Sequence, residues 1–98
     1  MPAVLIRHQV RDMTIWDQVF DGDRETRRAY GAQGCCVYRN AVDSTEIMVL
    51  LQWDDPDRAW LYAQSVDLHD LLARAEAIGP PRIWILDDDG GSSGPVSR

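Results

Sequence analysis

Lysine is absent from this chain of 98 residues, in which all ten basic residues are arginine. Codon bias in a GC-rich genome explains this absence better than a functional choice does. The 16 acidic residues give a formal net charge of −6, which disfavours nonspecific attraction to phosphate groups. We therefore expect no nucleic acid and no anionic membrane surface among its partners.

Long hydrophobic runs are missing too. No stretch approaches the roughly 18 apolar residues that a membrane helix needs, and the N-terminus lacks a charged segment followed by a long apolar one. The two cysteines, Cys35 and Cys36, are adjacent, so on a strand their side chains point to opposite faces and are badly placed to bond each other. Reduced thiols fit the cytoplasmic location that these features predict.

Motifs that hold metals or nucleotides are also lacking. The sequence has no C-x-x-C or H-x-x-x-H spacing for a metal, and neither the G-x-G-x-x-G nor the Walker pattern for a nucleotide. The cysteine pair shows no sign of a partner that would activate a thiol for catalysis. We therefore expect neither a metal nor another cofactor.

The chain does carry a regular order of hydrophobic patterns. The predicted strands span residues 3–10, 35–41, 46–53 and 82–86, and the predicted helices start at Thr14 and Pro56. This order, β-α-β-β-α-β, is that of a ferredoxin-like α+β unit, with an antiparallel sheet and helices on one face. Residues 1–88 therefore make one domain, and the Gly/Ser-rich residues 89–98 are expected to form a flexible tail without chemistry.

Local signals predict where the first helix begins and ends. Thr14, with a carboxylate three residues later, suggests a capping hydroxyl, and Gly31 suggests a left-handed terminator. Acidic residues precede basic ones between these ends, which is the order that the helix macrodipole prefers. These charged residues are Asp17, Asp21 and Asp23, followed by Arg24, Arg27 and Arg28.

The second helix is expected to start at a cap formed by Asp55 and to break near Ser65. Its inward residues are expected to be Ala59, Trp60 and Ala63, followed by Leu68, Leu71, Leu72 and Ala75. The sequence Gly79-Pro80-Pro81 should end this helix before the last strand.

The strand at residues 46–53 is apolar on both faces, a pattern typical of a strand that is covered twice. The ferredoxin-like unit supplies helices for only one face of its sheet. A second copy of the chain is the simplest cover for the other face, so the sequence predicts a homodimer.

His8 is the sharpest candidate for chemistry. It shares the more apolar face of the first strand, and an imidazole titrates near neutral pH. In that position His8 is either a catalytic base that removes a proton from a phenolic or enolic substrate, or a satisfied, half-buried histidine. His69, on the second helix, lies either at the rim of a pocket or on the surface.

Several aromatic residues are candidates for substrate binding, and core packing explains each of them as well. Trp16 and Phe20 are four residues apart on one helical face and are expected to line an apolar slot or to pack on the sheet. Trp53 and Trp60 carry the same two interpretations. Tyr38 is either an orienting hydroxyl for a substrate oxygen or an ordinary edge-strand tyrosine.

Five segments together resemble the antibiotic biosynthesis monooxygenase-like group of the dimeric α+β barrel superfamily. They are IRHQVRD, TIWDQVF, CCVYRN, IMVLLQWDDPDRA and GPPRIWIL, and the resemblance covers about residues 3–88. It implies a homodimeric barrel with helices outside and a cleft between each sheet and its own helices. Relatives include cofactor-independent monooxygenases, polyketide cyclases, haem-degrading enzymes and proteins without known activity.

The leading hypothesis is accordingly a small dimeric enzyme of the cofactor-independent monooxygenase or polyketide cyclase type, acting on an aromatic or polyketide-like molecule. In it His8 is the base, and Trp16, Phe20, Tyr38, Trp53, Trp60 and His69 bind the substrate. The alternative is a noncatalytic protein of the same fold that binds a small hydrophobic ligand. A third hypothesis is an accessory protein whose pocket is filled by side chains.

Overall fold

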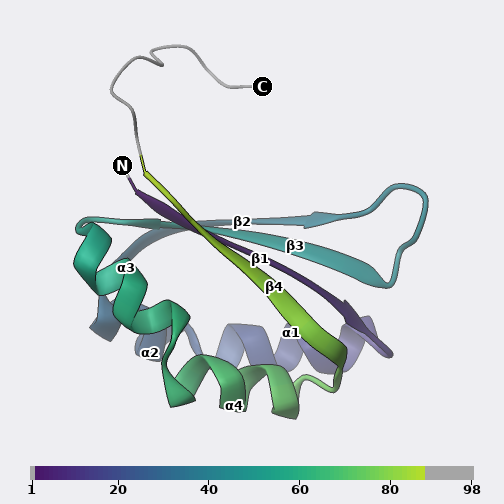
Figure 1. Cartoon of the computed structure of the whole chain (residues 1–98). Helices are drawn as coiled ribbons and strands as arrows, with labels where there is room; N and C mark the ends of the chain where they lie inside the picture. The colour runs from purple at the N-terminus through teal and green to yellow at the C-terminus, as the bar shows by residue number, and fades with distance from the viewer. Residues whose placement is uncertain (1, 88–98) are drawn as a thin grey trace.

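One antiparallel sheet and one layer of helices form the molecule, of which a computed structural model describes residues 2–87 (Figure 1). The strands are β1 (Ala3–Val10), β2 (Ala32–Arg39), β3 (Glu46–Trp53) and β4 (Ala77–Leu86). The helices are α1 (Met13–Gly22), α2 (Arg24–Tyr30), α3 (Pro56–Ala63) and α4 (Val66–Arg74). The strand order β2-β3-β1-β4 confirms the predicted ferredoxin-like α+β fold. The predicted tail at residues 89–98 lies outside the described residues.

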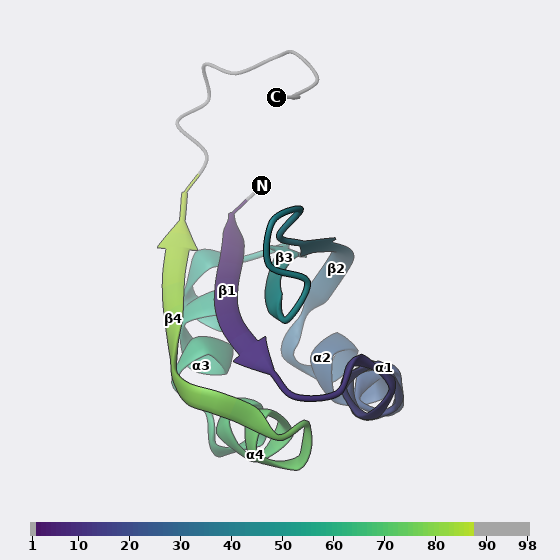
Figure 2. The same ribbon diagram turned by 90° about the vertical axis from the view of Figure 1, so that its right-hand side faces the viewer.

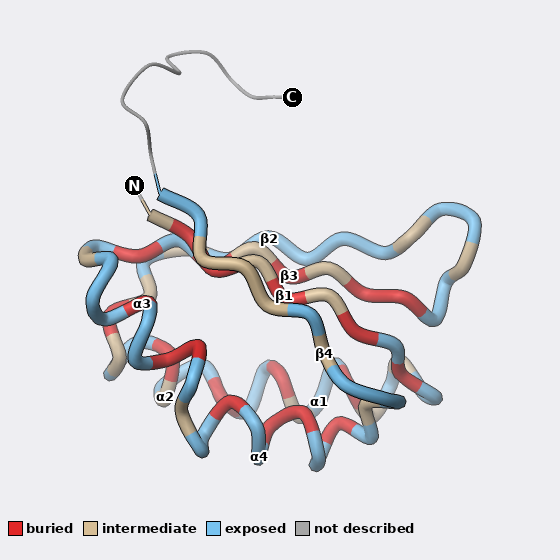
Figure 3. Tube along the Cα trace, viewed as in Figure 1, coloured by how far each residue is buried: buried red, intermediate tan, exposed pale blue. Residues whose placement is uncertain are grey.

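All four helices cover the same face of the sheet (Figures 1 and 2). Helices α3 and α4 lie on the β4 side, and α1 and α2 lie on the β2 side. Alternate residues of the two central strands point to the helices, with Val4 opposite Leu51 and His8 opposite Ile47. These residues are buried, so the core lies between the central strands and the helices (Figure 3).

The first helical region is two helices, so the prediction of one continuous helix is wrong. The amide of Asp23 donates to the carbonyl of Phe20 and closes α1, while the carbonyl of Asp23 accepts from Arg27 and opens α2. The predicted cap at Thr14 is also wrong, because the carboxylate of Asp12 accepts from the amide of Thr14 at 2.8 Å. Gly31 terminates α2 with a φ of 116°, as predicted.

The second helical region follows most of its sequence signals. Asp55 caps α3, and Ser65 caps α4 after the predicted break. Trp60 is not inward, however: its exposed fraction is 56%, whereas that of Tyr62 is 1%. The helical stripe therefore continues through Ala59, Tyr62 and Ala63.

The edge strands begin earlier than predicted. Strand β4 includes the Gly79-Pro80-Pro81 segment, which was expected to end a helix, and α4 already ends at Arg74. An edge strand tolerates proline because one of its sides needs no amide donor, and the β1–β4 register shifts beside this segment. Strand β2 begins at Ala32 rather than at residue 35, with a register shift between Ala32 and Gly34 that periodicity alone does not reveal.

Within residues 2–87, no helix lies on the second face of the sheet (Figures 1 and 2). Its central apolar side chains are only half-buried; these are Leu5, Met48, Leu50 and Trp84. We call this surface the bare face. No helix among residues 2–87 has the length and apolarity required to cross a membrane.

Candidate functional site

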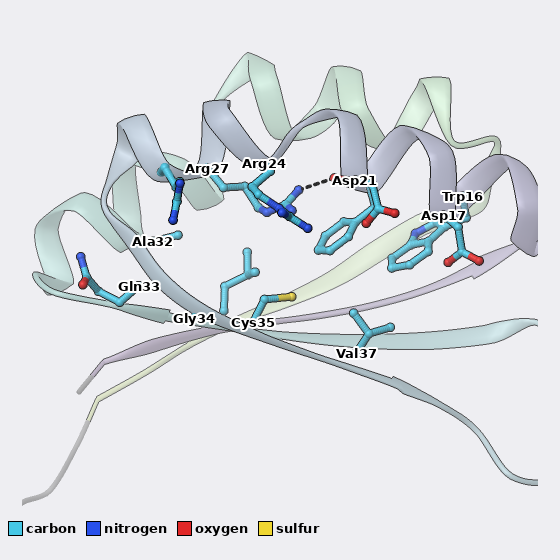
Figure 4. Close-up of a pocket in the computed structure, with 13 residues that line it drawn as sticks. Trp16, Asp17, Asp21, Arg24, Arg27, Ala32, Gln33, Gly34, Cys35 and Val37 are labelled. Atoms are coloured by element: carbon cyan, nitrogen blue, oxygen red, sulfur yellow. Dashed lines mark hydrogen bonds between the residues drawn. The ribbon is translucent and has the colours of Figure 1, made fainter.

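A cavity of about 480 Å³ lies between the first pair of helices and strand β2. Its wall comes from α1 (Trp16, Asp17, Phe20, Asp21) and α2 (Arg24, Arg27, Arg28), and its floor includes Cys35, Val37 and Leu51. Figure 4 shows these helical side chains above the strand that carries Cys35 and Val37. The cavity thus has the position of the cleft that the family resemblance implied.

The cavity is open because β2 is an edge strand that the helices cover incompletely. Cys35 and Val37 are paired with Leu51 and Val49, which places their side chains on the helix-covered face. Leu51 and Val49 are buried, yet Cys35 and Val37 remain exposed. The same sheet face is therefore closed at its centre and accessible at β2.

Two stacked aromatic rings form part of the wall. The rings of Trp16 and Phe20 are nearly parallel, with centroids 4.7 Å apart, and both side chains are buried in the described structure. Their spacing of four residues puts them on one face of α1, directed toward the sheet. We call this pair the aromatic slot; it forms an apolar part of the cavity wall, which an apolar ring of a ligand can contact.

A hydrogen bond to His8 fixes the indole of Trp16. The Nε1–H of Trp16 donates to Nε2 of His8 at 2.7 Å. Burial lowers the pKa of His8 from 6.5 to about 4, so the ring is neutral at pH 7 and carries its proton on Nδ1. That nitrogen is buried and has no hydrogen-bond partner within residues 2–87. His8 does not line the large cavity but borders a smaller one of about 260 Å³, beside Gln9 and Arg82.

Arg27 packs against the other side of the aromatic slot. Its guanidinium carbon lies 3.7 Å from the centre of the Phe20 ring, and its Nη1 donates to the Phe20 carbonyl at 2.8 Å. The residue is only 6% exposed. No carboxylate in the described part of the chain forms an ion pair with it.

Charged residues of α1 and α2 form the rim of the cavity. Asp17 and Asp21 are four residues apart on α1, Arg24 and Arg28 are four residues apart on α2, and all four line the cavity. The acidic pair thus lies on α1, and the basic pair lies on α2. The rim is therefore negative at one end and positive at the other.

The thiol of Cys35 stays protonated at neutral pH. Partial desolvation in the cavity raises its pKa, and the positive charges of Arg27 and Arg24 offset this only in part. A protonated thiol is a poor nucleophile. Cys35 and Cys36 are both free, and their register places them on opposite faces of β2, as predicted.

The structure brings only two of the predicted binding residues, Trp16 and Phe20, into this cavity. Trp53 is fully buried and packs on Tyr62, with ring centroids 5.2 Å apart. Tyr38 is exposed on the bare face of β2, and His69 is exposed on α4. Trp60 lines a separate groove between α3 and β4.

Sequence reasoning missed the charged residues of the cavity. The acidic and basic residues between positions 17 and 28 were interpreted only as a match to the helix macrodipole. Their spacing was a usable signal, because charged residues four positions apart lie on the same side of a helix and can together form the rim of a cavity. Residues 2–87 contain no group of three or more histidine, cysteine or acidic side chains placed to hold a metal ion.

Several solved structures share this fold. SnoaB, a cofactor-independent oxygenase from Streptomyces nogalater, matches at 12% identity and a TM-score of 0.73, over 97% of each chain. A Bordetella bronchiseptica protein, assigned by name to the antibiotic biosynthesis monooxygenases, matches at 15% identity and 0.73, over 89% of this chain and 95% of its own. A Caulobacter crescentus protein with the same assignment matches at 17% identity and a TM-score of 0.70. The match covers 89% of this chain and 88% of the other.

No family model matches this sequence, and no curated protein matches it. At the identities of the structural matches, the likeness establishes the fold and leaves the activity open. The resemblance to the antibiotic biosynthesis monooxygenase-like group is thus confirmed as a shared fold.

Proposed function

We propose that this cavity binds a flat aromatic or polyketide-like molecule, and that the chain is a small enzyme of the cofactor-independent monooxygenase or cyclase type. The observation that carries the proposal is the aromatic slot, Trp16 on Phe20, in the wall of a cavity of about 480 Å³. That volume is within the usual range for small-molecule sites. The cofactor-independent oxygenase among the structural matches supports the same assignment.

The proposed oxidation needs only the substrate and dioxygen. Transfer of a proton from an activated CH₂ group, as in an anthrone, to a water molecule gives a carbanion that the neighbouring rings stabilise; the proton returns to the peroxide in the later protonation step. The carbanion transfers its electrons to dioxygen and forms a C–O bond; after protonation, the resulting hydroperoxide loses water to leave a ketone. The net change is CH₂ plus O₂ to C=O plus H₂O, and the cavity contributes by binding and by stabilising the anion.

His8 remains a predicted catalytic base, and its surroundings favour a different role. A general base must reach the substrate proton directly or through one water. Nε2 of His8 is already occupied by Trp16, and the ring does not line the large cavity. We propose that His8 is a positioning residue, which fixes the plane of the Trp16 ring through their hydrogen bond.

We also propose that the protein is a homodimer. The bare face presents a line of apolar side chains at the centre of the sheet, and no element of residues 2–87 covers them. A second copy placed face to face would bury this surface and produce the barrel that the family resemblance implies.

Oxygen uptake with anthrone and naphthol substrates tests the proposed activity. We expect uptake by the wild type, and about a tenfold lower kcat/KM for Phe20→Leu, because the variant loses the flat surface of the slot. Val42→Ala is the matched control, since Val42 is 96% exposed in the β2–β3 loop. Binding of these compounds with full recovery under air would instead support the alternative, a noncatalytic ligand-binding protein.

A His8→Gln variant separates the two roles of His8 in the same assay. If His8 positions Trp16, kcat falls moderately and the pH dependence of kcat/KM keeps its shape. If His8 is the base, the limb of the pH profile that reports its deprotonation disappears. Unchanged uptake would remove His8 from both roles.

A further inference from the structure

Arg27 is a buried cation that forms no ion pair with a carboxylate of residues 2–87. With 6% of its surface exposed, it makes a hydrogen bond to a neutral carbonyl and lies on the face of Phe20. An uncompensated buried charge is costly, so buried charges are normally paired. Arg27 also lines the cavity, where a ligand has access to it.

Two further arginines stand at the same end of the cavity. Arg24 and Arg28 are exposed, and neither forms an ion pair within residues 2–87. By contrast, Arg7, Arg58 and Arg74 each pair with a carboxylate. Three of the ten basic residues thus gather without partners in one cavity of a chain whose net charge is −6. We call Arg24, Arg27 and Arg28 the arginine end.

The apolar and basic surfaces adjoin each other. Arg27 touches Phe20, so the arginine end continues directly from the aromatic slot. The charges of Arg27, Arg24 and Asp21 all act on the Cys35 thiol in the floor, so all three lie near the interior of the cavity. Asp17 lies at the far end, beside Trp16 (Figure 4), where it repels an anion and therefore favours one orientation of a charged ligand.

We infer that the ligand is an aromatic carboxylate, bound with its ring on the aromatic slot and its carboxylate at the arginine end. Guanidinium groups bind carboxylates through two parallel N–H···O bonds, a geometry that a planar aromatic acid matches. This inference rests on the proposed function, because it names the substrate class for the same cavity.

Calorimetric titration with 2-naphthoate and with its neutral analogue 2-naphthamide tests the inference. The two probes share the ring system and differ in charge. At low ionic strength the wild type should bind the acid about tenfold more tightly than the amide, and added salt should reduce this preference.

The variant Arg24→Gln/Arg28→Gln removes two charges from exposed positions, so it should fold normally. Its preference for the acid should fall about threefold, because Arg27 remains, with little change in amide binding. Arg11→Gln/Arg39→Gln is the matched control, because it changes the net charge equally at two exposed arginines outside the cavity. The control should keep the tenfold preference.

The outcomes separate this inference from the proposed function. Equal binding of acid and amide by the wild type, or an acid preference that is undiminished in Arg24→Gln/Arg28→Gln, overturns the inference alone. Loss of affinity for both probes in Phe20→Leu would still locate an aromatic ligand in the cavity. If neither probe binds the wild type, the aromatic ligand itself is contradicted, and both proposals fail.

Discussion

The two faces of the sheet differ most clearly at neighbouring residues of β3. Leu51 points to the helices and is fully buried, whereas Leu50 points to the bare face and is only half-buried. The two residues are the same amino acid on the same strand, so the difference comes from what lies above each face. The comparison teaches that burial in this fold depends on the covering layer, and that the chain supplies such a layer for one face only.

The covered face is itself uneven. Over β1 and β3 it is closed by aliphatic and aromatic side chains, while over β2 it opens into the cavity. The cavity therefore occurs where an edge strand extends past its helices. On the bare face, by contrast, the half-buried apolar side chains lie at the centre of the sheet.

The largest expected effect concerns the covered face. Leu51→Ala should lower the free energy of unfolding by about 3 kcal/mol, since it removes a fully buried side chain and leaves a void. The loss should be the same at every protein concentration, as measured by urea denaturation. A loss below about 1 kcal/mol would show that the covered face is not the well-packed one.

Acid should weaken the covered face through His8. Its pKa is lowered by burial from 6.5 to about 4, so between these values the unfolded chain binds a proton that the folded chain does not. Above pH 6.5 the buried His8 therefore does not lower the free energy of unfolding. As the pH falls from 6.5 toward 4, this free energy decreases by up to about 3 kcal/mol.

Urea denaturation as a function of pH measures this effect, with His8→Gln as the control. The pH dependence of the variant should be shallower than that of the wild type in this window. Carboxylates such as Glu46 titrate in both proteins, so the difference between the two curves isolates His8. Parallel curves would contradict the lowered pKa.

The smallest effect on the folded protomer is expected on the bare face. Leu50→Arg should change the stability of the isolated protomer by less than about 1 kcal/mol, because Leu50 is only half-buried. In the proposed dimer, however, it would bury a charge, so sedimentation at micromolar concentration should show a dimer for the wild type and a monomer for the variant. A monomeric wild type would contradict the dimer.

Much of the fold was predictable because it depends on local rules. Strand β3 has its predicted bounds, and Asp55, Ser65 and Gly31 act at the predicted ends of their helices. The errors arose where longer-range structure decides the outcome. The break at Asp23 and the early starts of β2 and β4 depend on hydrogen bonds and register shifts that hydrophobic periodicity does not report.

The candidate site was predictable only in part. Trp16 and Phe20 were found because residues four apart share a helical face, but Trp60 was placed inward and is exposed. Arg27 was missed since nothing in its local sequence distinguishes a buried arginine from an exposed one. Its environment is set by Phe20, seven residues earlier, across the junction between two helices.

By itself, the sequence determined the order of the strands and helices and the apolar character of both sheet faces, because these follow from the period of side chains along a strand or helix. The tertiary structure decided which face is covered, that β2 is left open at the edge, and that three arginines meet the aromatic slot there. Such convergence depends on how helices rotate and pack against a particular edge of the sheet, and this geometry is fixed only when the whole core assembles.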